Sequence, residues 1–286
     1  MLRQEEVTPA VVRGVEGIDG ARLIVGFLPL APYRDFALPI LGRVGEVTAE
    51  MIEADPDTYQ VGDVAGLSGL QARYDDTLRG TPGLKVDAVD VDGGKRELFA
   101  TKAAPGAALQ LTMDLDLQTE AESLLADVGP ASALVALKPS TGAILAAANG
   151  PGNAGINLAT FGQFAPGSTF KSVSSLALLR AGLTPGTVVP CTASIVVDGK
   201  TFTNYDDYPA GAIGNIPFRT ALANSCNTAF ISQAAKLKGT DLFDAGVSLG
   251  IGLDHDLGFP AYFGSVEPST SKTESAAQLI GQGTIL

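Results

Sequence analysis

An apolar segment from Ser168 to Ala181 follows the helix-breaking pair Pro166-Gly167 and stops at Gly182. Its leucine, valine and alanine residues recur at helical spacing, which predicts a helix of about four turns. Ser168 and Lys171 are three positions apart, so their side chains share one face of this helix. Because a mostly apolar helix is expected to be buried, the two polar groups must face either a polar partner or a cleft.

The same pattern predicts further elements on either side of this helix. Helices are expected over 67–78, from the helical spacing of apolar residues, and over 117–125, where Asp114 or Asp116 would be the N-cap. Hairpins are expected over 85–100, where apolar and polar residues alternate around Asp92-Gly93-Gly94, and from the paired apolar runs at 131–137 and 143–148. A polar, strand-rich stretch spans 194–208, and a second mostly apolar helix spans 229–236. Residues 1–60 contain short apolar runs at 21–30 and 37–41, typical of short strands without strong helices.

Pro105-Gly106 separates the chain into a strand-rich part and a part richer in apolar helices. We take this pair as a domain boundary, with one domain at residues 1–104 and another at 105–286. The number of residues, 286, is enough for either one large domain or two.

The chain carries a net charge of −12 with a pI near 4.5, which argues against nucleic acid or an anionic membrane surface as the main partner. No apolar run of about 18 residues is present, so no transmembrane segment is predicted. The first residues show no signal-peptide core, which fits a mature secreted fragment and a cytosolic protein equally.

The scarcity of histidine and cysteine limits the chemistry that the chain can perform. His255 is the single histidine and stands among aspartates, so we interpret it as a solvated surface residue rather than a catalytic or metal-binding one. Cys191 and Cys226 are too few for a zinc site or a disulfide framework. A nucleophile in this protein therefore needs a base other than histidine, and lysine is the candidate.

Ser-x-x-Lys occurs twice, and about one match is expected by chance in a chain of this length. The match from Ser269 to Lys272 lies in a polar loop, and we set it aside. The match from Ser168 to Lys171 opens an apolar helix. Burial and the helix dipole should both lower the pKa of Lys171, which allows it to accept the proton of Ser168. The pair alone fits equally well a helix-capping serine beside a lysine that reaches solvent.

The tripeptide Ser225-Cys226-Asn227 changes this balance. It is the only Ser-x-Asn in the chain, and it lies between two apolar stretches, where its hydroxyl and amide could reach another element. Ser-x-x-Lys followed by Ser-x-Asn is the motif pair of penicillin-recognising enzymes, in which a third motif is Lys-Thr-Gly.

With these motifs the chain resembles the class B penicillin-binding protein transpeptidases. The resemblance rests on Pro166 to Lys171 and Asn224 to Thr228, and it extends to the surrounding segments 142–146, 157–159 and 280–283. Residues 66–80 look like part of the non-catalytic pedestal of that class. The similarity covers nearly everything from about residue 40 onward.

The resemblance implies a role for each motif residue. Ser168 would attack the penultimate D-Ala carbonyl of a peptidoglycan stem peptide or a β-lactam, with Lys171 as base. Ser225 would relay a proton to the leaving amine, and Asn227 would hold both the substrate amide and Lys171. The implied D,D-transpeptidase mechanism uses no cofactor and no metal.

The resemblance also implies an architecture and a location. We expect an α+β fold, with an antiparallel sheet flanked by helices and a strand-rich, dimerisation-type pedestal in the N-terminal domain. The parent protein would be membrane-anchored at the outer face of a bacterial plasma membrane. There it would act on peptidoglycan with other cell-wall synthesis or division proteins, and without nucleic acid.

One family motif has no counterpart in the sequence. Lys-Thr-Gly should follow Gly281-Gln282-Gly283 by some tens of residues, and Lys272-Thr273-Glu274 precedes that marker and is no substitute. We therefore expect a fragment that lacks the C-terminal strands of the domain. A β-lactam-binding or scaffold module without turnover and a serine β-lactamase remain alternatives. In an extracytoplasmic protein Cys191 and Cys226 could pair, and the sequence leaves that question open.

Overall fold

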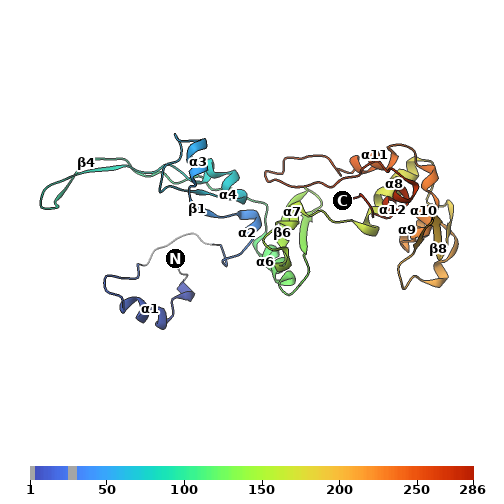
Figure 1. Cartoon of the computed structure of the whole chain (residues 1–286), viewed down its shortest axis with the longest axis horizontal. Coiled ribbons are helices and arrows are strands. Elements are labelled where there is room, and N and C mark those ends of the chain that lie inside the picture. The colour runs from blue at the N-terminus through green and yellow to red at the C-terminus, as the bar shows by residue number, and fades with distance from the viewer. Residues whose placement is uncertain (1–3, 25–30) are drawn as a thin grey trace. The chain divides into compact units, whose positions relative to one another are not determined.

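The computed structural model describes residues 4–24 and 31–286 (Figure 1). The chain divides into two compact units, Met1–Phe36 and Ala37–Leu286. The first unit contains the 3-10 helix η1 (Gln4–Glu6) and helix α1 (Pro9–Glu16). Helix α1 begins at an N-cap, Thr8, whose hydroxyl accepts from the Val11 amide, and Pro9 occupies its first turn. Both features favour a helix start.

The prediction of short strands without strong helices over residues 1–60 is wrong. Three helices lie there, namely α1, α2 (Leu38–Leu41) and α3 (Ala49–Ala54), beside one described strand, β1 (Val44–Glu46). Thr48 caps α3 as Thr8 caps α1, and Pro39 lies in the first turn of α2. Capping and proline position therefore override the apolar pattern in these short segments. Of the run predicted at 21–30, residues 25–30 lie outside the described part of the chain, and 21–24 form no regular element.

The second unit begins with small sheets and short helices. Strand β1 pairs antiparallel with β2 (Val64–Gly66), and β3 (Lys85–Val89) pairs with β4 (Lys95–Ala100) as the predicted hairpin. The helix predicted over 67–78 is divided at Tyr74 into α4 (Gly69–Arg73) and α5 (Asp75–Leu78). Asp75 explains the break, because its buried carboxylate accepts from the Gly66 amide at 2.8 Å and the Tyr59 hydroxyl at 2.8 Å.

The predicted hairpin at 131–148 consists of β5 (Ala133–Lys138) and β6 (Ala143–Asn149), with α6 (Leu115–Leu125) packed against it. Asp114 is the N-cap of α6 and accepts from the Leu117 amide at 2.9 Å. The buried Gln118 fixes this helix to the sheet, since its Oε1 accepts from the Ala147 amide at 2.8 Å. The hairpin therefore reaches its helix through both apolar packing and a buried hydrogen bond.

The remaining elements surround the motifs. They are α7 (Leu158–Phe161), α8 (Lys171–Arg180), α9 (Phe218–Ala223), α10 (Asn227–Ser232), α11 (Asp241–Val247) and α12 (Lys272–Gln278); the 3-10 helices η2 (Pro151–Asn153), η3 (Gly167–Phe170), η4 (Ala210–Ala212) and η5 (Ala234–Lys236); and strands β7 (Val188–Cys191), β8 (Ser194–Val197), β9 (Lys200–Thr203) and β10 (Gly214–Pro217). Strand β7 pairs with β10, and β8 pairs with β9.

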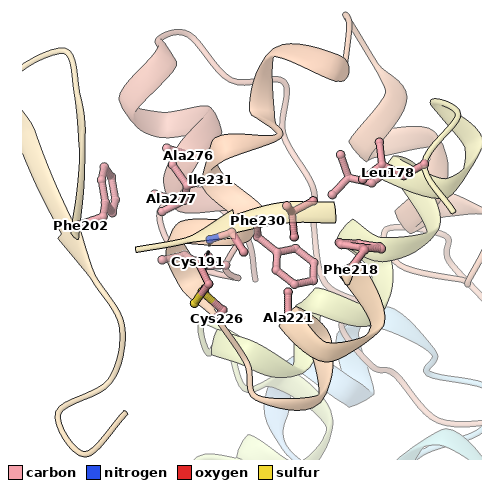
Figure 2. Close-up of a cluster of buried hydrophobic side chains, with 14 residues drawn as sticks. Leu178, Cys191, Phe202, Phe218, Ala221, Cys226, Phe230, Ile231, Ala276 and Ala277 are labelled. Carbon is pink, nitrogen blue, oxygen red and sulfur yellow. Dashed lines mark hydrogen bonds between the residues drawn. A yellow bond between two sulfur atoms is a disulfide. The ribbon is translucent and has the colours of Figure 1, made fainter. Parts of the chain in front are cut away.

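A hydrophobic core includes Cys226, the middle residue of the Ser-x-Asn tripeptide (Figure 2). Leu178 of α8, Phe218 of α9 and Phe230 of α10 contribute large side chains, and the Phe218 and Phe230 rings lie 5.2 Å apart between centroids. Each sheet among the described residues has two strands. Within the same residues, no helix is both long enough and apolar enough to cross a bilayer.

Candidate active site

Ser168 lies in a tight helical turn that leads directly into α8. Gly167 has a φ of 56°, a left-handed conformation that glycine adopts without strain, and the 3-10 helix η3 (Gly167–Phe170) follows. The single helix predicted from Ser168 is thus a 3-10 turn joined to the α-helix Lys171–Arg180. Ser168 is exposed to solvent, and Lys171 is the first residue of the α-helix.

The Lys171 side chain is buried, with 1% of the residue exposed. Its ammonium nitrogen Nζ donates to Ser168 Oγ at 2.7 Å, to Ser225 Oγ at 3.1 Å and to Asn227 Oδ1 at 2.6 Å. An ammonium group has three protons, and each of them has an acceptor here. The structure therefore brings together all four residues that the sequence singled out, although Lys171 and Ser225 are 54 positions apart.

Burial lowers the pKa of Lys171 to about 8. The groups that face Nζ are two hydroxyls, one amide oxygen and the ring of Phe230, whose centroid lies 5.7 Å away. Burial thus disfavours the charged form, and no carboxylate of the described residues forms an ion pair with Lys171 that would favour it again. At pH 7 roughly a tenth of the molecules carry a neutral amine at this position, which can accept a proton.

Ser225 lies in the loop between α9 and α10 and adopts a φ of 54°. A left-handed conformation costs a residue with a side chain about 1–2 kcal/mol, so surrounding contacts must hold it. The Ser225 amide donates to Leu222 O at 2.9 Å, and the Cys226 amide donates to Ala221 O at 2.8 Å. These bonds to the end of α9 hold the turn that directs the Ser225 hydroxyl toward Lys171.

The first residue of α10, Asn227, has a fixed amide orientation. Its Nδ2 donates to the carbonyl oxygen of Thr203 on β9 at 2.9 Å, which leaves Oδ1 to accept from Lys171. The hairpin formed by β8 and β9 therefore determines which atom of the amide faces the amine. Sequence reasoning did not identify this carbonyl, because no side-chain pattern marks a backbone acceptor.

Gly281 also shapes the site, and the sequence marked it only as part of the family-like segment 280–283. It has a φ of 70°, and a Cβ at this position would lie 1.9 Å from Gly167 O. The Gly167 amide donates to Gly281 O at 2.8 Å. The start of the Ser168 turn thus packs directly on the backbone of Gly281, and only glycine fits this approach.

His255 and the second Ser-x-x-Lys, which the sequence set aside, form other contacts. His255 is exposed, and its ring meets Phe263 edge-on at 5.3 Å between centroids. Ser269 pairs its hydroxyl with that of Ser275 at 2.5 Å, while Lys272 opens α12. The prediction of a surface position for His255 is confirmed.

Cys191 and Cys226 form a disulfide (Figure 2). It joins the end of β7 to the residue between Ser225 and Asn227. The sequence left this pairing open, and the structure resolves it in favour of the bond.

Comparison with known proteins assigns the family. The model of the penicillin-binding protein transpeptidase domain matches residues 132–286, which include Ser168, Lys171, Ser225 and Asn227. The chain belongs to the penicillin-binding protein transpeptidase family. The model of the penicillin-binding protein dimerisation domain matches residues 28–111. The resemblance inferred from the motifs is therefore confirmed.

Individual relatives agree with this family. The chain is 27% identical to the peptidoglycan D,D-transpeptidase MrdA of Acinetobacter baumannii over an alignment of 246 residues, which covers 76% of this chain and 36% of that protein. A solved peptidoglycan synthase complex that coordinates polymerisation and crosslinking contains a chain 28% identical to this one. The TM-score is 0.72, over 86% of this chain and 51% of that one.

A complex between the penicillin-binding protein PBP2 and MreC from Helicobacter pylori contains a chain of the same fold. It is 20% identical, with a TM-score of 0.75 over 89% of this chain and 54% of that one. The α+β fold expected from the sequence is confirmed by these neighbours and by the helices and small antiparallel sheets of this penicillin-binding protein. The chain spans about a third of the length of the Acinetobacter relative and about half of each solved chain.

Proposed function

We propose that this chain is the acylating part of a peptidoglycan D,D-transpeptidase that also binds β-lactams. The observation that carries the proposal is the buried Lys171 Nζ, which lies 2.7 Å from Ser168 Oγ and 3.1 Å from Ser225 Oγ. A lysine with a lowered pKa beside an exposed serine supplies the base that serine needs as a nucleophile. The family match over residues 132–286 supports the same reaction class.

In the proposed acylation, neutral Lys171 accepts the proton of Ser168 as Oγ attacks the carbonyl carbon of the penultimate D-Ala. The developing oxyanion meets the Ser168 backbone amide, because amides in the first turn of a helix have no partner within that helix. Ser225 then passes a proton from Lys171 to the amine of the departing D-Ala. The acyl group remains on Oγ, and an acceptor amine takes it to form the cross-link.

Asn227 serves two purposes in this scheme. Its Oδ1 fixes the position of the Lys171 amine at 2.6 Å. The amide also shares the Lys171 amine with both serine hydroxyls, and it can bind the amide backbone of a stem peptide. The bond from Nδ2 to Thr203 O keeps this side chain in one orientation while the amine changes protonation.

We infer that residues 1–104 form part of the pedestal and that residues 105–286 belong to the transpeptidase domain, as the sequence boundary predicts. The family matches at 28–111 and 132–286 support this division. Because the relatives take part in cell-wall synthesis, we propose that the parent protein is membrane-anchored and works at the outer face of the plasma membrane. Other cell-wall synthesis or division proteins would be its partners there.

A fluorescent penicillin tests the proposed acylation directly. We expect one covalent adduct per chain, and peptide mapping by mass spectrometry should locate it on Ser168. An adduct that persists for hours supports a transpeptidase, and one lost within minutes indicates a serine β-lactamase. A stable adduct without release of D-Ala from a stem-peptide mimic indicates a β-lactam-binding module. Absence of any adduct contradicts the proposal.

The rate of acylation should rise with pH. Since burial lowers the pKa of Lys171 to about 8, the neutral amine increases nearly tenfold per pH unit well below pH 8 and saturates above it. The second-order rate constant for the fluorescent penicillin should therefore climb from pH 6 and level off near pH 9. Hydrolysis of the free penicillin at each pH provides the correction. A rate that is flat over this range would exclude Lys171 as the base.

Replacing Gly281 by alanine should slow acylation by about 10- to 100-fold, because the new Cβ displaces the turn that carries Ser168. Gly283 provides a matched control. Its φ is 77°, close to the 70° of Gly281, but its Cβ would meet only Ala277 Cβ at 3.5 Å. The Gly283→Ala variant should therefore show the effect of backbone strain on the acylation rate without displacement of the turn that carries Ser168. Equal acylation rates in the two variants would contradict a role for the Gly167–Gly281 contact.

A further inference from the structure

The disulfide includes the middle residue of the Ser-x-Asn motif. Cys226 separates Ser225 from Asn227, and both of these neighbours contact Lys171 Nζ. Cys191 is the last residue of β7, and it pairs with Gly214 of β10. Both half-cystines are fully buried, at 0% exposure, in the core that also contains Phe230 (Figure 2). The bond therefore attaches the middle of the Ser-x-Asn motif to a paired strand.

Hydrogen bonds hold the motif on both sides of the disulfide. Upstream, the amides of Ser225 and Cys226 are bonded to the end of α9. Downstream, the Thr228 hydroxyl accepts from the Thr192 amide at 2.9 Å and donates to Thr192 O at 2.8 Å. Thr192 directly follows Cys191, so the threonine pair runs beside the disulfide.

The two kinds of link constrain different atoms. The hydrogen bonds fix backbone before Cys226 and a side chain after it, whereas the disulfide fixes the side chain of Cys226 itself. Cys226 has an extended backbone, with φ −66° and ψ 106°, between the left-handed Ser225 and Asn227, the first residue of α10. With Cys226 Sγ bound in the core, Ser225 and Asn227 are held toward Lys171.

We propose that the Cys191–Cys226 disulfide is a positioning element for acylation, which holds Ser225 and Asn227 in register with Lys171. This inference rests on the proposed function. The disulfide form of the chain is the competent one, and a chain without the bond binds penicillin and transfers the acyl group more slowly. Cys191 and Cys226 act through Ser225 and Asn227, and neither touches the reacting atoms.

The bond also stabilises the fold, because it closes a loop with a sequence separation of 35 residues and restricts the unfolded chain. A test must separate this general effect from positioning. The Leu125→Ala variant offers a matched control, since Leu125 lies in the separate cluster of α6 with Ala121, Ala146 and Ala148. Truncation of the Leu125 side chain should lower the Tm without moving the Ser-x-Asn motif.

The experiment compares the Cys191→Ala/Cys226→Ala double variant with Leu125→Ala and the unchanged chain, well below each Tm. We expect the double variant to react with a fluorescent penicillin about tenfold more slowly or worse, and Leu125→Ala to react at the unchanged rate. The second readout is the titration of the Lys171 amine by ¹⁵N NMR. In the double variant the pKa should rise from about 8 toward the ordinary lysine value of 10.5, because the loosened motif admits water to Nζ.

The two readouts distinguish the possible failures. If the unchanged chain forms no adduct, the proposed function fails, while the Lys171 titration still decides whether the disulfide positions the motif. If the double variant keeps both the rate and the pKa of Lys171, the disulfide only stabilises and the inference is wrong.

A variant-free measurement applies if the double variant does not fold. Dithiothreitol supplies two electrons and two protons to open the bond, becomes a cyclic disulfide, and is removed before penicillin is added. Acylation should be slow in the reduced protein and should recover on reoxidation. A reduced, folded protein that reacts at the oxidised rate would overturn the inference.

Discussion

Replacing Ser168 by alanine is expected to abolish covalent labelling by a fluorescent penicillin. The hydroxyl that bonds Lys171 at 2.7 Å is the proposed nucleophile, and alanine offers no atom to form the acyl bond. The helical turn should persist, because the Ser168 side chain lies on an exposed residue and the turn is held by Gly167 and Gly281. Labelling is measured by in-gel fluorescence and intact mass after an hour with excess penicillin.

Ser269→Ala is the control for this variant. Ser269 begins the second Ser-x-x-Lys of the chain, but its hydroxyl pairs with that of Ser275 in α12. This variant should label as fully as the unchanged chain. An adduct of normal yield on the Ser168→Ala variant would assign the nucleophile to another residue.

Replacing Lys171 by methionine should reduce the acylation rate by about 10²–10⁴-fold, the usual contribution of a positioned general base. Methionine is unbranched, is one atom shorter than lysine and suits a buried site, but it cannot accept a proton. The variant should also lose the rise of rate with pH, because the group with a pKa of about 8 is gone. Labelling with the fluorescent penicillin, quenched after a series of times at each pH from 6 to 9, measures both effects.

The fold of this variant should survive. Burying a neutral side chain removes the cost of a desolvated ammonium, which offsets the loss of three hydrogen bonds. Circular dichroism and the Tm check this point, and Lys272→Met serves as the control at an unrelated lysine. A Lys171→Met rate within a few-fold of the unchanged chain would show that another group takes the proton from Ser168.

The sequence predicted the local parts of this site well. Ser168 and Lys171 interact within a single turn, and a spacing of three residues is enough to predict that they share a face. The hairpin at 131–148 and the capped helix after Asp114 also depend on short-range patterns. These features need only propensity, alternation and capping, which neighbouring residues determine.

Long-range contacts could not be predicted in the same way. The approach of Gly281 to Gly167 and the bond from Asn227 to Thr203 O depend on how separate elements pack. The motif pairing of Ser225 with Lys171 came from family resemblance and not from periodicity. In residues 1–60 the apolar runs were too short to distinguish strand from helix, and the caps Thr8 and Thr48 decided the outcome.

The three acceptors around Lys171 Nζ have a consequence for the path of the proton. Asn227 Oδ1 can only accept, so one N–H of the amine must always point to it. A neutral amine then has one remaining N–H and one lone pair, which the hydroxyls of Ser168 and Ser225 share. Rotation about the Cε–Nζ bond would exchange these two partners, so that the amine accepts a proton from Ser168 and donates one to Ser225. In the proposed acylation, Asn227 thus holds one N–H of the amine in place while the other N–H and the lone pair change partners between the two serines.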